Sequence, residues 1–530
     1  SSTSRPIPHS GNGPGLHVVS LERRQMIGRL QKWWCPHVPL EAHELTQEWV
    51  TEALRVAGID DSVQGVQVRW LNESDVSAGG ATGSKLFKVV ASLKDSPALV
   101  MVYKAMPSTY YGEMSWGERA MFAIMEPSIH NALALGHNLP FNEGEYYDAF
   151  EVRRILQPGL PTPRIFAAPS RGNRVSRVGL FTMKWYRNAA NGLLMEDLTA
   201  CGYRGFGPHM DVGTEVARAA MADLARFHAG HWGKPYVRAR APPVTVMHWF
   251  GQSVLQNRDF CRHLERGAAE GRLLRDLLAA RGQGLLVKCN LPDRVPRPEL
   301  LQPKKAPAAL PELFEPEGGA FFSALRLLET GQAALMARVR RILGRRETLL
   351  MGDAHSGNIF VRDAPVGAPG GGRPEVRWID FQHWGSGAAA LDLAYFFMGS
   401  VDAQPGRDTE LLRLYHTEFS EASHLSFEEL QADTAAAMLL LASAALFHYP
   451  IYTWPGGSGI ISCFVDPNNL AAVPARIKDA EQNYRMIYRM IQRVPLILGD
   501  SSHPLTRELL AKHDQVLKSR PAGGGLRSRL

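Results

Sequence analysis

The sequence predicts an α+β fold with a small antiparallel sheet lobe followed by a large, mainly helical lobe. Three stretches after residue 65, "VQVRWL", "KLFKVVASL" and "ALVMVYKA", alternate like strands and are separated by turn sequences. Further on, "TEVARAAMADLARFHAGHW" places Val216, Ala220 and Leu224 on one helical face. A chain of 530 residues is also too long for one simple core, which favours two or more lobes.

Between these parts, the pattern predicts a helix around residues 142–156 and strands in "LPTPRIFAA", "VGLFTMKW" and "GLLMEDL". Helices resume over residues 321–343, and "VRWIDFQ" is expected to form a strand after a glycine-rich turn. The expected parts are a flexible tail over 1–20, a helical extension over 21–65, a β-rich nucleotide-binding lobe over 66–199, a helical lobe over 200–518 with a catalytic hairpin over 348–392 and a Pro-rich insertion over about 289–319, and a flexible basic tail over 519–530.

The composition argues against several classes of protein. The formal charge of +7 comes from scattered basic residues, whereas a dedicated nucleic-acid binder concentrates them in a stripe, so we expect no nucleic-acid partner. The longest strongly apolar run, residues 435–447, is too short for a membrane span. Five cysteines without a CxxC or Cys/His cluster argue against a structural zinc or a disulfide framework, and they favour reduced thiols in an intracellular protein.

The last three residues, Ser528-Arg529-Leu530, resemble the S-K-L peroxisomal address. They follow a Gly-rich, basic stretch that is expected to leave the terminus accessible. The expected location is therefore the cytoplasm or the peroxisomal matrix. The sequence carries no signal for a particular oligomeric state.

The candidate catalytic residues begin in "TLLMGDAHSGNIFVRD", residues 348–363. An apolar run ends at Asp353, and Asn358 follows just before a second apolar run; after a glycine-rich turn, "WIDFQ" delivers Asp380. A hairpin of this kind brings Asp353, Asn358 and Asp380 to one end. Two carboxylates and an amide oxygen suit Mg²⁺, which keeps waters and substrate phosphates in its shell. An ordinary polar turn is the alternative.

The β-rich lobe contains a glycine-rich loop whose backbone could approach phosphates closely. The spacing in "GGATGSK" is not that of a Walker A sequence, and a plain hairpin turn is the alternative. The candidate phosphate-binding residues of this loop are Gly79, Gly80, Thr82, Gly83 and Ser84.

Lys104 lies inside the strand "VMVYKA", where a charged side chain needs a reason. Glu143 or Glu145, at the start of the next helix, could pair with it. The alternatives are a lysine on the outward face of the strand and ordinary acidic residues at a helix N-terminus.

Together these segments, over residues 66–484, resemble the ecdysteroid kinase-like family, with aminoglycoside phosphotransferases and choline kinases as wider relatives. "GDAHSGNIF" is similar to the catalytic loop, and "WIDFQHWGSGAAALDLAYFF" to the metal-binding strand and the helix after it; "DFQ" favours the ecdysteroid kinase-like branch. "LLMEDL" resembles the hinge, and "LARFHAGHW" the helix that follows the hinge. "NEGEYYDAFEVRRILQPGLPTPRIF" resembles the first helix and the next strand.

The resemblance implies a two-lobed protein-kinase-like fold and ATP-dependent transfer of the γ-phosphoryl group to a hydroxyl of a small molecule, with Mg²⁺ as the metal. Asp353 would be the catalytic base, and Asn358 and Asp380 would hold Mg²⁺. Lys104, steadied by Glu143, would contact the ATP phosphates, which the glycine-rich loop would cover.

Three further roles follow from the same resemblance. The hinge residues Glu196, Asp197 and Leu198 would flank adenine, and Asp392 would brace the catalytic loop. Met351 stands where the family usually has a histidine that supports the loop, so reduced activity or an altered loop is possible.

Two other functions fit parts of the sequence. A nucleotide-binding pseudokinase or scaffold is suggested only by Met351. A protein kinase is disfavoured because no segment with an A-P-E-like end follows Asp380. Acceptors compatible with the sequence include steroid alcohols, choline-like amino alcohols, aminoglycosides and hydroxyacyl thioesters. His355 and His383 either touch the acceptor or are satisfied loop histidines.

Overall fold

The computed structural model describes residues 37–71, 85–107, 143–144, 146–152, 154–178, 181–207, 210–239, 334–364, 372–447, 489 and 492–519. Several expected features lie outside these residues. They are the glycine-rich loop with its five candidate residues, Glu145, the Pro-rich insertion and the two tails, including Ser528-Arg529-Leu530.

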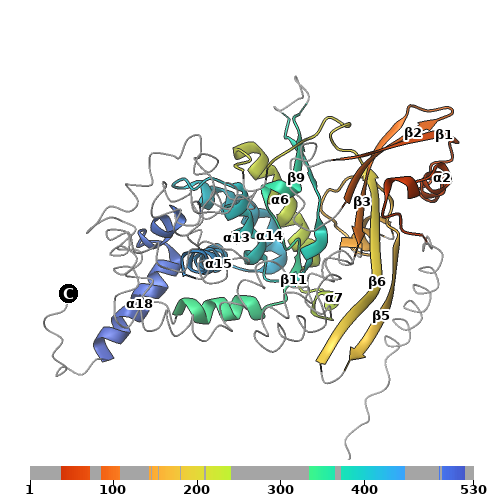
Figure 1. Cartoon of the computed structure of the whole chain (residues 1–530). Helices are drawn as coiled ribbons and strands as arrows, with labels where there is room; N and C mark the ends of the chain where they lie inside the picture. The colour runs from red at the N-terminus through yellow and green to blue at the C-terminus, as the bar shows by residue number, and fades with distance from the viewer. Residues whose placement is uncertain are drawn as a thin grey trace, which may run out of the picture.

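The β-rich part is one antiparallel sheet with the strand order β1-β2-β3-β6-β4, and β5 pairs with the free part of β6 (Figure 1). The three alternating stretches after residue 65 form the first three strands, as the sequence predicts. The strands are β1 (Val63–Trp70), β2 (Lys85–Leu93), β3 (Leu99–Pro107), β4 (Ile165–Ala167), β5 (Ser170–Val178) and β6 (Phe181–Glu196).

Strand β6 differs from the prediction, which separated "VGLFTMKW" from "GLLMEDL". The structure has one strand of 16 residues there, because "RNAANG", which has the composition of a turn, continues both ladders. Asn191 pairs with Met106 of β3 on one side and with Ser170 of β5 on the other. Gly192 fits this strand because Tyr103 fills its space: an added Cβ would lie 1.9 Å from the Tyr103 hydroxyl.

The helix expected over residues 142–156 is shorter and less regular. Helical backbone is present from residue 143, and a π-helical turn, η3 (Asp148–Val152), follows it. Arg154 then has a φ of +50°, a left-handed conformation that cannot continue a right-handed helix.

One face of the sheet is covered by the N-terminal segment, which contains η1 (Ala42–Glu44) and α2 (Gln47–Val56). The helix starts at Thr46, whose hydroxyl accepts the Trp49 N–H at 3.2 Å. Val50 and Leu54 are fully buried, and they pack in the same apolar cluster as Phe87 and Tyr103 of the sheet. This second core is separate from the main core of the helical lobe.

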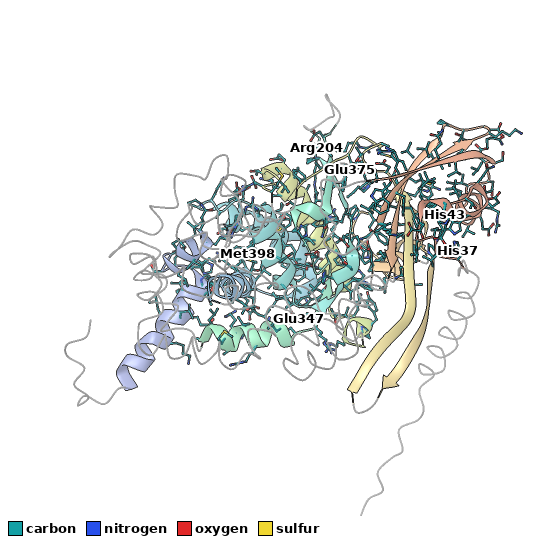
Figure 2. The ribbon with its side chains drawn as sticks, in the orientation of Figure 1. His37, His43, Arg204, Glu347, Glu375 and Met398 are labelled. Carbon is teal, nitrogen blue, oxygen red and sulfur yellow. The ribbon has the colours of Figure 1, made fainter. Side chains whose placement is uncertain are left out.

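The helical lobe surrounds α13, which is buried along its whole length, as its mostly apolar sequence requires; Asp392 is its one charged residue (Figure 1). Met398 of α13 lies well inside this lobe in Figure 2. Helix α6 packs on α14, and α13 packs on α15. The described helices of this lobe include α6 (Thr214–His231), α7 (Pro235–Ala239), α13 (Ala389–Ser400), α14 (Arg407–Ser423), α15 (Phe427–Phe447) and α18 (Pro504–Ser519), and a further helix covers residues 334–344.

Two small sheets frame the predicted hairpin. Strand β8 (Thr348–Leu350) pairs with β11 (Gly385–Gly387), while β9 (Ile359–Arg362) pairs with both β10 (Glu375–Trp378) and β7 (Arg204–Gly205). Arg204 and Glu375 mark this second sheet in Figure 2. A small antiparallel sheet joined to a large helical part confirms the α+β, two-lobed fold class. Among the described helices, none combines the length and the apolarity that crossing a membrane requires.

His231, near the end of α6, is held in its neutral form. Its Nε2 lies 2.7 Å from the Pro158 carbonyl and its Nδ1 lies 2.6 Å from the Tyr236 hydroxyl. Since a carbonyl can only accept, Nε2 carries the proton and Nδ1 accepts from the hydroxyl. Burial lowers the pKa of His231 to about 4, because the charged form would lose its water.

We predict that Leu54→Ala lowers the free energy of unfolding by ~2–5 kcal/mol, because it leaves a cavity between α2 and the sheet. Leu510→Ala is the matched control, since Leu510 is 37% exposed, and its effect should be below ~1 kcal/mol. Chemical denaturation of both variants measures the difference. Equal effects would contradict the packing of α2 on the sheet.

We also predict that acid weakens the fold through His231. Its folded-state pKa of about 4 lies below the ordinary 6.5, so the unfolded chain binds the extra proton. The free energy of unfolding should therefore fall as the pH drops from 6.5 to 4, by up to ~3 kcal/mol from this residue. Denaturation at several pH values should show a smaller fall in His231→Gln, and an unchanged pH profile would contradict the prediction.

Candidate active site

Lys104 of β3 lies between two carboxylates. Its Nζ is 2.8 Å from Oε2 of Glu143 and 3.1 Å from Oδ1 of Asp380. Lys104 and Glu143 are buried. Strand alternation explains the direction: Tyr103 faces the α2 side, so its neighbour Lys104 faces the opposite side of the sheet.

This pairing fixes the charge state of the lysine. Burial by itself would lower the pKa of Lys104, but the nearby charges of Asp380 and Glu143 outweigh burial and raise it above its ordinary value. Burial raises the pKa of Glu143, an effect that Lys104 opposes. Lys104 therefore stays cationic at neutral pH, beside two acidic partners.

Asp353, Asn358 and Asp380 come together at one end of the β9–β10 hairpin. Nδ2 of Asn358 donates to the Asp353 carbonyl at 3.0 Å and lies 3.3 Å from Oδ2 of Asp353. The Ile379 N–H donates to the Asn358 carbonyl at 3.1 Å, which fixes Asp380 next to Asn358. Asp380 has a left-handed backbone, φ +63° and ψ +64°, a strained conformation that accumulates at functional sites.

The donor set at this end fits Mg²⁺. Because Nδ2 of Asn358 points to Asp353, the amide oxygen is the atom left for a ligand, and the Asp380 carboxylate is close by. Both are hard oxygen ligands. The described part of the chain contains no group of three His, Cys, Asp or Glu residues that could hold a metal ion. Mg²⁺ in proteins usually has only one or two carboxylate ligands, together with water and phosphate oxygens.

Asp392 of α13 binds the backbone of the loop that carries Asp353. Its carboxylate accepts the Met351 N–H at 2.7 Å and the Gly352 N–H at 2.9 Å. His228 Nε2 lies 3.2 Å from the same carboxylate, and His228 Nδ1 lies 2.7 Å from the Tyr415 hydroxyl. All of these groups are buried, so this is an enclosed polar network with satisfied partners.

Met351 takes part in this network only through its backbone N–H, and its side chain is fully buried in the main core. The histidine that the network does contain, His228, comes from α6. His228 is not among the site residues that the sequence predicts. A histidine on the apolar helix "LARFHAGHW" nevertheless indicates a need for buried hydrogen-bond partners.

One face of α13 holds three points of the loop that carries Asp353. Asp392 binds the backbone at Met351 and Gly352, Tyr395 contacts the His355 ring edge-on with centroids 6.0 Å apart, and the Gly399 carbonyl accepts the Ser356 hydroxyl at 3.1 Å. The spacing of these α13 residues, i, i+3 and i+7, places them on one side of the helix.

The hinge side chains are occupied within the lobe. Oδ1 of Asp197 accepts the N–H groups of Thr199 and Ala200 at 3.0 and 3.1 Å, and Oδ2 pairs with Lys88 at 2.9 Å. Oε2 of Glu196 accepts the Arg164 N–H at 3.3 Å, and Leu198 is buried. These two carboxylates hold the hinge in shape. Its backbone is also largely paired: the Glu196 and Asp197 N–H groups donate to the Arg164 and Val100 carbonyls, and the Leu198 carbonyl accepts the Tyr203 N–H at 2.9 Å.

Cys201 lies beside the hinge and donates its thiol to Oε1 of Glu196 at 3.1 Å. Burial, together with the Glu196 carboxylate, raises the pKa of Cys201 to about 11. The thiolate is therefore scarce at neutral pH, and this cysteine is a structural neighbour rather than a nucleophile.

Comparison with known proteins confirms the resemblance found in the sequence. Residues 325–426 match the model of the ecdysteroid kinase-like family. This segment carries Asp353, Asn358, Asp380 and Asp392, while the β-rich lobe lies outside it. No curated protein sequence matches the chain.

Two solved structures resemble the chain weakly. A proposed aminoglycoside phosphotransferase from Ralstonia eutropha JMP134 aligns over 84% of this chain and 98% of its own, with 12% identity and a TM-score of 0.32. The amicoumacin kinase hAmiN, solved with AMP-PNP, Ca²⁺ and Ami, aligns over 81% and 88%, with 9% identity and a TM-score of 0.31. Scores this low do not establish a shared fold, so the fold class rests on the architecture of the chain itself.

We predict that Gly352→Ala strongly destabilises the loop. Gly352 has a φ of +84°, and an added Cβ would lie 1.9 Å from the His383 carbonyl oxygen. Gly406→Ala is the control, because its φ of +80° is nearly the same but nothing lies within 4 Å. We expect a loss of ~1 kcal/mol for Gly406→Ala and ~3 kcal/mol or more for Gly352→Ala. Chemical denaturation measures both, and equal losses would contradict the close approach of the two loops.

Proposed function

We propose that this protein is an ATP- and Mg²⁺-dependent kinase that transfers the γ-phosphoryl group to a hydroxyl of a small metabolite. The observation that carries the proposal is the position of Lys104, held between Glu143 and Asp380, with Asp380 joined to the Asp353–Asn358 loop through the Ile379 N–H. A cation, two oxygen ligands and a candidate base at one place are the parts that phosphoryl transfer needs.

The proposed step balances in one displacement. The acceptor oxygen forms a bond to the γ-phosphorus, the bond from that phosphorus to the β–γ bridging oxygen breaks, and ADP leaves with the electron pair. Asp353 receives the proton that the acceptor hydroxyl loses. Its position next to Asn358 keeps this carboxylate close to the phosphate end of the site.

Lys104 would stabilise negative charge on the ATP phosphates. It is already cationic, and its direction is fixed by Glu143 and Asp380 before any ligand binds. Asn358 and Asp380 would hold the metal, and Mg²⁺ when bound supplies charge neutralisation at the phosphate oxygens.

The alternative is a nucleotide-binding pseudokinase, for which Met351 was the sequence support. The Asp392 carboxylate holds the loop through the backbone of Met351 and Gly352, a support that does not depend on the side chain at position 351. This arrangement favours the kinase over the pseudokinase.

We predict that Asp353→Ala lowers phosphoryl transfer at least ~100-fold, because a positioned base contributes about that much. The control is Asp363→Ala, since Asp363 lies on the same hairpin but is exposed and pairs only loosely with Arg204 at 3.3 Å. A metabolite extract incubated with protein, ATP and Mg²⁺ and read by mass spectrometry measures the transfer. Equal product from wild type and Asp353→Ala would overturn the kinase and support the pseudokinase.

A further inference from the structure

His355 lies in the catalytic loop, two residues after Asp353, and is largely enclosed: its side chain is 14% exposed. It is the N-cap residue of the short turn η6 (Ser356–Asn358), and its Nδ1 accepts the Gly357 N–H at 3.0 Å. The histidine therefore starts the turn that ends at Asn358.

The capping bond fixes which ring nitrogen carries a proton. An N–H group can only donate, so Nδ1 must be the bare nitrogen and the proton sits on Nε2. Burial lowers the pKa of His355, but the Asp353 charge outweighs it and raises that pKa. A second proton would go to Nδ1 and break the cap, while Nε2 would stay protonated. Nε2 is thus a donor in either charge state.

The donor Nε2 is directed at the candidate base. It lies 3.5 Å from Oδ2 of Asp353, the same oxygen that Nδ2 of Asn358 approaches at 3.3 Å. Two donors from opposite ends of one short turn converge on one carboxylate oxygen. Such an arrangement limits rotation of the carboxylate about its Cβ–Cγ bond.

The ring itself is held by the helix behind the loop. Tyr395 of α13 contacts it edge-on, with centroids 6.0 Å apart and planes at 70°. The same helix binds the loop backbone through Asp392. The orientation of the imidazole is therefore set by the cap on one side and by α13 on another.

We propose that His355 is a positioning residue that sets the orientation of Asp353 toward the acceptor hydroxyl. This inference rests on the proposed kinase function. This role differs from the two interpretations of His355 drawn from the sequence, which were a contact with the acceptor and a loop histidine whose hydrogen bonds are merely satisfied. His355 acts through Asp353, by donating from Nε2.

Three substitutions separate this role from simple packing. His355→Phe keeps the ring and its contact with Tyr395 but has no donor. His355→Gln supplies an amide N–H₂ near the position of Nε2. His416→Gln is the matched control, because the His416 ring bonds the Leu425 carbonyl at 2.8 Å and contacts Phe427, away from the site.

The measured quantities are kcat and the KM for ATP of Mg²⁺-dependent ATP hydrolysis with water as acceptor, together with the melting temperature of each variant. We expect His355→Phe to lower kcat about tenfold with an unchanged KM, since a misaligned group slows the chemical step rather than nucleotide binding. His355→Gln should recover part of that loss, and His416→Gln should match the wild type. Histidine-selective ¹⁵N labelling, assigned by the signal lost in His355→Gln, should show a protonated Nε2 and a bare Nδ1.

The outcomes distinguish a failure of the proposed kinase function from a failure of the role proposed for His355. If Asp353→Ala hydrolyses ATP as fast as the wild type, the proposed function itself fails. If Asp353→Ala is impaired but His355→Phe retains the wild-type kcat, or matches His355→Gln, the role of His355 is packing and this inference is overturned. A bare Nε2 in the labelled wild type would overturn it as well.

Discussion

The candidate active site depends on one buried carboxylate. Asp392 accepts two consecutive backbone N–H groups, those of Met351 and Gly352, and it is itself contacted by His228. Charge-assisted bonds of this kind are strong when water is excluded, and a buried carboxylate without them would be costly. Through this contact, α6, α13 and the loop that carries Asp353 become one body. The loop that carries Asp353, with the turn that ends at Asn358, starts from this anchor.

Much of the fold could be predicted because its signals are local. The alternation in "KLFKVVASL" and "ALVMVYKA" predicted the strands, and the polar break at Asp353 between two apolar runs predicted the loop between β8 and β9. The unity of β6 could not be predicted, because "RNAANG" has the composition of a turn and becomes a strand only where β3 and β5 flank it. Tertiary pairing overrode local propensity there.

The charged residues of the candidate site could be named from the sequence, whereas the residues that hold them in place could not. Lys104 and Asp380 are charged residues between apolar neighbours, a pattern that a sequence displays directly, whereas Glu143 and Glu145 could be told apart only in the structure. The partners of Asp392 depend on the approach of α6 and on which atom faces which, and His228 is 164 residues away along the chain. The hinge carboxylates show the same limit. The resemblance implied that this segment flanks adenine, but the sequence did not indicate that the Glu196 and Asp197 carboxylates accept the Arg164 and Thr199 N–H groups.

The single β6 strand fixes the distance between the hinge and the level of Lys104 in the sheet lobe. Glu196 at the hinge and Leu193, which pairs directly with Lys104, are three residues apart on one uninterrupted strand. A strand advances ~3.3 Å per residue, so ~10 Å separates the hinge backbone from the level of the lysine. Neither end can shift along the strand without breaking the ladder to β3. Any ligand that reaches both the hinge backbone and the Lys104 ammonium group must therefore span this fixed separation of ~10 Å.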